Sequence, residues 1–311
     1  MENDNKETFP KPGPLMGIAF MVFELVVAIF GFSALQIYFG MWGLVLTEIG
    51  IALIALLGAW VTSLDIREML PIRRIKISQV LGTVLLWMST MYIMLIVNMT
   101  FFYFFPEGME VGAEMSSFFG QWPFWAVVLV VAVMPAICEE MLHRGFIQRC
   151  MMRKVKSKLA VSILMGIFFG IFHLDFYRFL GTAFLGGVMA YILVSTDNFI
   201  YNMLFHFINN LFAELVSYGA DSTVVESAGD LLNAETIPPM VGTYMVMGFM
   251  VPFIMLAGIL LLKGKQQIKE EGTAKLAVSI CIAGVMTVLF IVVGVYLIMN
   301  NYETIMKMSV Y

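Results

Sequence analysis

Charged residues are scarce in this 311-residue chain: they make up 13% of it, whereas hydrophobic residues make up 60%. Soluble globular domains carry about 25% charged residues, so this composition excludes an ordinary soluble domain. The net charge of -4 offers no general basic surface, which argues against nucleic acid as a partner. A mean hydropathy of +0.90 indicates instead a protein that crosses the lipid bilayer several times.

Cysteine is also rare, and the three cysteines have no paired spacing. Cys138, Cys150 and Cys281 are single residues in or beside hydrophobic segments, so no disulfide framework is implied. The chain shows no internal repeat, no low-complexity tract and no linker long enough to separate a soluble domain. We therefore expect residues 1–311 to form one integral membrane domain.

Long hydrophobic segments are what the chain has most of, and most are near the ~20 residues that a spanning helix needs. They predict an all-α polytopic membrane helix bundle of about eight to nine transmembrane helices. A central four-helix core is expected at about residues 122–216, with flanking spans at 14–105 and 240–299. The nine segments are Pro14–Tyr38, Trp42–Leu64, Gln79–Phe105, Trp122–Cys138, Leu159–His173, Arg178–Val194, Asn198–Val216, Met240–Leu262 and Ala274–Met299.

Lysine and arginine concentrate in three loops, at Leu64–Ser78, Arg149–Lys158 and Lys263–Lys275. The loops Pro106–Gly120 and Gly219–Pro239 carry only acidic charges. Because positively charged short loops stay on the cytoplasmic side, this pattern predicts a cytoplasmic N-terminus and an outer C-terminus. The compact span pattern fits a prokaryotic plasma membrane, and the polar stretch Gly219–Pro239 is expected to fold as a small outer cap.

All three histidines lie between Glu139 and Asn210, inside hydrophobic segments and close to the pair Glu139-Glu140. Ionisable groups at bilayer depth cost free energy, so this clustering is the strongest functional signal in the sequence. Residues four apart share a helix face, which predicts an ion pair between Glu140 and Arg144 and places His206 above Asn210.

Two further expectations concern the shape of this region. Pro135 removes a backbone hydrogen bond four residues before Glu139 and can kink the helix there. For Glu139 to reach His173, the helix that carries Glu139 must be long, from about Pro123 to Met152, and the segment after His173 must be short or partly re-entrant.

These residues resemble the CAAX protease and bacteriocin-processing (CPBP, or Abi) family of intramembrane proteases, which includes the type II CAAX prenyl endopeptidases. The motif EExxxR is matched from Glu139 to Arg144, FxxxH from Phe169 to His173, and HxxxN from His206 to Asn210. The resemblance covers about Trp122 to Glu214, a third of the chain. One departure is His143, where relatives often carry an aromatic residue.

The resemblance implies an intramembrane endopeptidase that hydrolyses membrane-bound or lipidated peptides without a covalent intermediate. Glu139 would activate a water molecule, and His173 would orient that water. His206 and Asn210 would donate hydrogen bonds to the oxygen of the tetrahedral intermediate. Glu140 and Arg144 would support the site.

Several alternatives remain open at this point. Glu139, His173 and His206 are also the ligand types of a catalytic zinc site, although no cofactor is favoured because the HExxH signature is absent. The chain is alternatively a non-catalytic bacteriocin immunity or scaffold protein, or a small-solute transporter that uses Glu24 and Glu48. His143 is expected to be solvated or to face lipid headgroups. The sequence does not indicate the oligomeric state.

Overall fold

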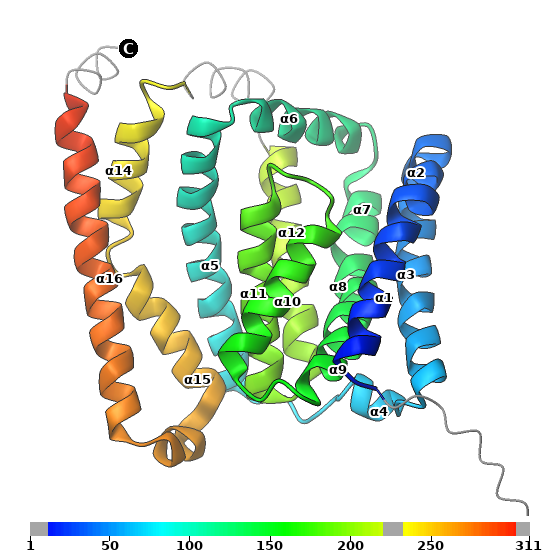
Figure 1. Ribbon diagram of the computed structural model, residues 1–311. Helices are drawn as coiled ribbons and strands as arrows, with labels where there is room; N and C mark the ends of the chain where they lie inside the picture. Colours follow the sequence, from blue (N-terminus) through cyan, green and yellow to red (C-terminus); the bar gives the residue numbers. More distant parts are fainter. Residues whose placement is uncertain (1–11, 220–232, 303–311) are drawn as a thin grey trace, which may run out of the picture.

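The computed structural model describes residues 12–219 and 233–302, and every regular element in these two ranges is a helix (Figure 1). The expected all-α polytopic membrane bundle is therefore confirmed. Within these ranges, seven helices are long and apolar enough to cross a membrane: Pro14–Phe39, Met41–Thr62, Ile77–Phe104, Phe124–Met152, Phe179–Thr196, Val251–Glu271 and Thr273–Asn300. In the labels of Figure 1 these are α1–α2, α3, α5, α7–α9, α11, α15 and α16.

Two of the nine expected segments form helices that differ from these seven. Helix α10 (Lys158–Phe172) is apolar but has only 15 residues. Helix α12 (Phe199–Gly219) has 21 residues, among them the polar residues Asn202, His206, Asn209 and Asn210. The C-terminus of α10 positions His173, and α12 carries His206 and Asn210, so the shortest and the most polar of the expected segments supply three of the four candidate catalytic residues.

The segment expected as one span at Met240–Leu262 is broken, which corrects that prediction. Helix α14 (Ile237–Met247) ends before Gly248, and α15 (Val251–Glu271) starts three residues later. Pro252 has no backbone N–H and cannot donate to the carbonyl of Gly248, so a continuous helix is interrupted there. Figure 1 shows α14 and α15 meeting part of the way along α16.

The basic loops all lie at one end of the bundle, at the bottom of Figure 1, where the short helix α4 (Ile66–Met69) is also found. Helix α6 (Glu107–Gly120) lies across the opposite end. This segregation agrees with the charge pattern of the loops. The sidedness in the cell stays a prediction, and the proposed outer cap falls largely on residues 220–232, outside the described residues.

Asp197 connects two of the basic loops through ion pairs with Arg149 and Arg73, the former at 2.7 Å between Nη2 and Oδ1. It lies between α11 and α12, outside the spanning segments. Burial alone would raise the pKa of Asp197, but hydrogen bonds from the two arginines outweigh it and hold the pKa below 3.8.

The helix that carries the carboxylate pair runs through the interior of the bundle. In the most apolar stretch of Phe124–Met152, 44% of the residues are buried, against 11% in α16, which lies at the periphery. Helices α10 and α11 pack closely against each other because Gly166 has no side chain. A Cβ at this position would lie only 2.5 Å from the carbonyl oxygen of Ala183. This close hairpin positions His173 beside the interior helix.

Candidate active site

The helix with the carboxylate pair extends over 29 residues, Phe124–Met152, close to the predicted Pro123–Met152. It is not a regular α-helix, because α8 (Met134–Glu140) is flanked by π-helical segments at Val128–Val133 and Met141–Ile147. Such π segments often occur at functional sites, where they re-aim side chains. Pro135 lies in the first turn of α8, so the irregularity coincides with the residue expected to kink the helix.

Pro135 also explains a contact between helices. A proline at this position cannot donate to the carbonyl of Val131, which is four residues earlier. Asn210 on α12 supplies a donor instead, since its Nδ2 lies 2.8 Å from the Val131 oxygen. The amide of Asn210 is thereby held against the helix of Glu139.

Glu140 and Arg144 form the ion pair that their spacing predicts. Arg144 Nη1 donates to Glu140 Oε1 at 2.9 Å, and both side chains are completely buried. Arg144 also donates to the carbonyl of Gly186 at 3.1 Å and stacks over the Phe169 ring at 4.2 Å. The guanidinium thus joins this helix to α10 and α11.

His206 lies between the two carboxylates. Its Nδ1 is 2.9 Å from Glu140 Oε1, and its Nε2 is 3.9 Å from Glu139 Oε2. Because Glu140 is paired with Arg144 and accepts hydrogen bonds, the Nδ1 atom of His206 is the donor in the shorter contact. This contact fixes the orientation of the imidazole ring, so that Nε2 faces Glu139.

His173 caps the C-terminus of α10 and is also held by a single hydrogen bond. Its Nδ1 is 2.8 Å from the carbonyl oxygen of Phe169, which can only accept, so Nδ1 carries the proton. Its Nε2 is then the lone-pair nitrogen in the neutral ring. Because α10 has only 15 residues, about 22 Å in length, His173 lies within the ~30 Å thickness of the hydrocarbon layer.

The four residues expected to act in catalysis line one cavity. Glu139, His173, His206 and Asn210 all contribute to a pocket of about 130 Å³. The remaining residues of its wall are Met94, Asn98, Phe169, Arg178, Gly181, Thr182, Leu185 and Asn209. Met94 and Asn98 come from α5, so the cavity draws on a helix outside the central core expected at 122–216.

The sequence analysis missed four polar residues of this wall: Asn98, Arg178, Thr182 and Asn209. Asn209 adjoins Asn210 and donates to its Oδ1 at 3.1 Å, so adjacency to the HxxxN motif was a usable signal. Asn98 offered no such signal, since it is a single amide in an apolar span. Arg178 follows His173 by five residues. Its backbone N–H donates to Asp175 Oδ1 at 3.2 Å, and within the described part of the chain its guanidinium makes no ion pair and one hydrogen bond, to the Met115 sulfur at 3.3 Å.

The position of His143 contradicts the expectation of a solvated side chain. It is completely buried, and its Nε2 lies 3.4 Å from Oε1 of Glu24, which is buried equally deeply in the first span. The ring also packs edge-on against Phe172, with centroids 4.7 Å apart. Glu24 and His143 thus face each other at an ion-pair distance in the interior, although no hydrogen bond joins them. Glu48 is buried nearby and interacts electrostatically with both Glu139 and Glu24.

A metal ion does not fit the described side chains as they stand. Among residues 12–219 and 233–302, no group of three or more His, Cys, Asp or Glu is arranged to hold a metal, and this includes Glu139, His173 and His206. The Nδ1 contacts of both histidines, with Phe169 and with Glu140, are of the kind that metal-bound histidines also make, so it is the arrangement of the three side chains that does not suit a metal. No step of the reaction is therefore assigned to a metal.

The fold and the cavity together define a class: a polytopic helical membrane protein with a carboxylate, two histidines and an asparagine around a buried cavity. Residues 121–212 match the family model described as Type II CAAX prenyl endopeptidase Rce1-like, which is a protease family. The resemblance to CAAX proteases is therefore confirmed over the segment that contains all three motifs. Comparisons with curated proteins and with solved structures give no match.

Proposed function

We propose that this protein is an intramembrane endopeptidase that hydrolyses membrane-bound or lipidated peptides with a water molecule activated by Glu139. The observation that carries the proposal is the convergence of Glu139, His173, His206 and Asn210 on one cavity. These residues come from three segments that are far apart in sequence. A purely structural role for each polar group would not require them to share a cavity inside an apolar bundle.

In the proposed reaction, a water molecule sits between Glu139 and the unprotonated Nε2 of His173. His173 accepts one hydrogen bond from the water and orients it, and Glu139 takes the other proton as oxygen attacks the peptide carbonyl. The C–N bond then breaks, and Glu139 returns the proton to the leaving amine. No bond forms between the peptide and the protein.

The negative oxygen of the tetrahedral intermediate needs donors on the opposite side. Asn210 uses one N–H of its amide for Val131 and retains a second, and Asn209 likewise retains one after its bond to Asn210. Protonated Nε2 of His206 is a third donor, and Glu140 stabilises that protonated ring through Nδ1. Because these groups are fixed before substrate binds, each contributes about 3 kcal/mol to lowering the barrier.

The test is cleavage of a panel of fluorogenic peptides tethered to lipid, with the purified full chain in bilayer discs. We expect Glu139→Gln to lower the turnover rate about 10²–10⁴-fold, because it removes the base but keeps the side-chain shape. Glu214→Gln is the matched control, since Glu214 is a buried glutamate on α12 that does not belong to the cavity wall described above. Equal activity of Glu139→Gln and wild type would reject Glu139 as the base.

The alternatives give different results in the same preparation. A non-catalytic immunity or scaffold protein would cleave no peptide of the panel, whereas a transporter would show proton-coupled uptake in vesicles that depends on Glu24 or Glu48. A zinc-dependent protease would lose activity with a chelator and regain it with added zinc. The proposed mechanism predicts activity that withstands the chelator.

A further inference from the structure

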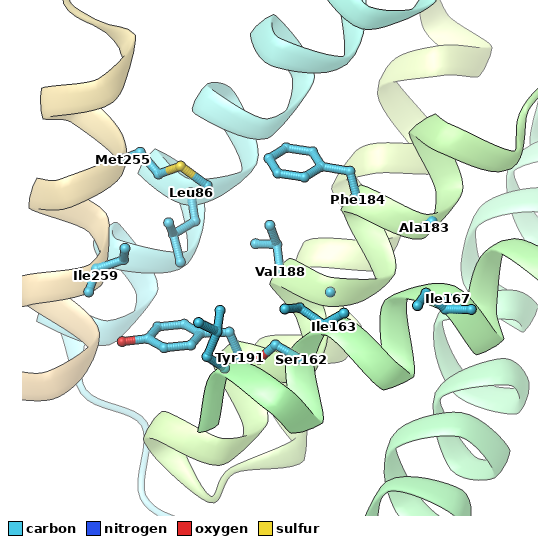
Figure 2. A pocket seen from close by; sticks show the side chains of 12 residues that line it. Leu86, Ser162, Ile163, Ile167, Ala183, Phe184, Val188, Tyr191, Met255 and Ile259 are labelled. Atoms are coloured by element: carbon cyan, nitrogen blue, oxygen red, sulfur yellow. The ribbon is translucent and has the colours of Figure 1, made fainter. Parts of the chain in front are cut away.

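A second, apolar hollow lies on the outside of the bundle between the α10–α11 hairpin and helices α5 and α15. It has a volume of about 380 Å³. Figure 2 shows Phe184, Val188 and Tyr191 of α11 facing Met255 and Ile259 of α15 across this groove. Its α10 side is formed by outward-facing residues such as Ile163, which is 53% exposed, so the groove opens toward the surrounding lipid.

This groove is separate from the candidate active site. The active-site cavity is lined by Gly181, Thr182 and Leu185, whereas the groove is lined by Phe184 and Val188 of the same helix. The two hollows therefore use different faces of α11. A molecule in the groove would not contact Glu139 or His173.

A neighbouring apolar groove of about 320 Å³ runs between α15 and α16. It shares Tyr191, Met255 and Ile259 with the first groove, and its wall includes Lys263. The two grooves thus adjoin each other along α15, and both approach the basic end of the bundle.

Lysines gather at that end of the grooves. Lys158 precedes Leu159, which lines the first groove, and Lys263 lies one turn beyond Ile259. The charges that act on Lys158 are those of Lys263, Lys275 and a single carboxylate, Glu271. Lys263 Nζ donates to Glu271 Oε2 at 2.8 Å and interacts electrostatically with the Tyr191 hydroxyl. Three cations against one anion leave a net positive charge where the apolar grooves end.

We infer that the two grooves and the cluster of Lys158, Lys263 and Lys275 form a binding site for an anionic diacyl phospholipid. The acyl chains lie in the two adjoining grooves, and the lysines bind the phosphate group. Basic pockets between membrane helices bind anionic headgroups in this way. A zwitterionic headgroup would bring an additional cation toward the lysines and bind less well. The bound lipid joins the hairpin that carries His173 to α15 and α16.

The experiment is native mass spectrometry of the delipidated full chain, titrated with dioleoyl phosphatidylglycerol or dioleoyl phosphatidylcholine. We expect the first phosphatidylglycerol to bind at least about tenfold more tightly than phosphatidylcholine. Combined Lys158→Gln, Lys263→Gln and Lys275→Gln should abolish this preference. The matched control combines Lys76→Gln, Lys154→Gln and Lys156→Gln, which removes the same net charge from exposed sites at the same end of the bundle. This control should retain the preference for phosphatidylglycerol.

Two more variants separate the groove from the charge. Ile163→Trp fills the groove and should weaken the binding of both lipids, because the acyl chain is displaced. Glu271→Gln removes the only carboxylate among the groups that act on Lys158, and should strengthen phosphatidylglycerol binding. Equal affinity for the two lipids in wild type, or equal loss of preference in both lysine triples, would overturn the site.

Discussion

Replacing Arg144 by methionine should strongly destabilise the fold, because Arg144 holds three helices together from a completely buried position. The side chain binds Glu140 at 2.9 Å and the Gly186 carbonyl at 3.1 Å, and it covers the Phe169 ring. Methionine has a similar length and fills most of the space. It leaves the carboxylate of Glu140 without its cation.

The expected loss follows from these contacts. Removing one partner of a buried ion pair costs about 3–5 kcal/mol, since the remaining charge is left without compensation. The lost hydrogen bond to Gly186 adds about 1.5 kcal/mol. We therefore expect the free energy of unfolding to fall by roughly 5 kcal/mol in Arg144→Met. The double variant Glu140→Gln/Arg144→Met removes both charges, and it should recover about half or more of that loss.

The free energy of unfolding can be measured by steric trapping in lipid bicelles for wild type, both single variants and the double variant. The four values form a double-mutant cycle, which isolates the coupling between Glu140 and Arg144. We predict a coupling of at least about 2 kcal/mol. Additive losses would show that the pair contributes no mutual stabilisation, and would refute the reasoning.

Three further predictions follow from other contacts. His143→Phe and Glu24→Gln should each lower the free energy of unfolding by about 1–3 kcal/mol. The double variant should cost less than the sum of the two, because neither group is then left facing a missing partner. Unfolding in bicelles measures all three losses. Gly166→Ala should lower the rate of peptide cleavage and cost about 1–3 kcal/mol in the same unfolding measurement. The added methyl group would meet the Ala183 carbonyl and push α10 and His173 away from the cavity. Unchanged cleavage would contradict this. Asp197 should stabilise the fold at pH values above its ordinary pKa of 3.8, and this stabilisation should be lost as the pH falls through its lowered pKa in the folded protein. The unfolding free energies of wild type and Asp197→Asn should therefore converge only in strong acid. A difference between them that does not change with pH would contradict this.

The sequence predicted the membrane class from local rules, and the four cavity residues from their clustering and from the three motifs that resemble the CAAX protease family. The length of an apolar segment indicates a spanning helix, and an interval of four residues places His206 and Asn210 on one helix face. The requirement that Glu139 reach His173 also predicted a helix close to Phe124–Met152. The break before α15 was missed although its cause, Pro252, is visible in the sequence.

Other features depend on how distant helices pack, and no local pattern reports them. His143 was expected near solvent because it begins the basic end of its helix, but the first span covers it with Glu24. Asn98 and Arg178 reach the cavity from α5 and from the turn after α10. Glu139 and Glu140 lie in the α-helical segment α8, about 100° apart around its axis, and the sequence therefore suggested that they face different neighbours. Both approach His206 because the ring offers Nε2 to Glu139 and Nδ1 to Glu140, a contact that depends on where α12 packs.

The most direct test of the account is a double-variant cycle on the rate of peptide cleavage, with Glu139→Gln and His173→Ala alone and combined. Both side chains are proposed to act on the same water molecule, and groups that act as a unit have strongly non-additive effects. We predict that each change alone slows cleavage about 10²–10⁴-fold and that the combination is at most about tenfold slower than the slower single variant. A combined loss equal to the product of the two single losses would contradict a shared water in this cavity.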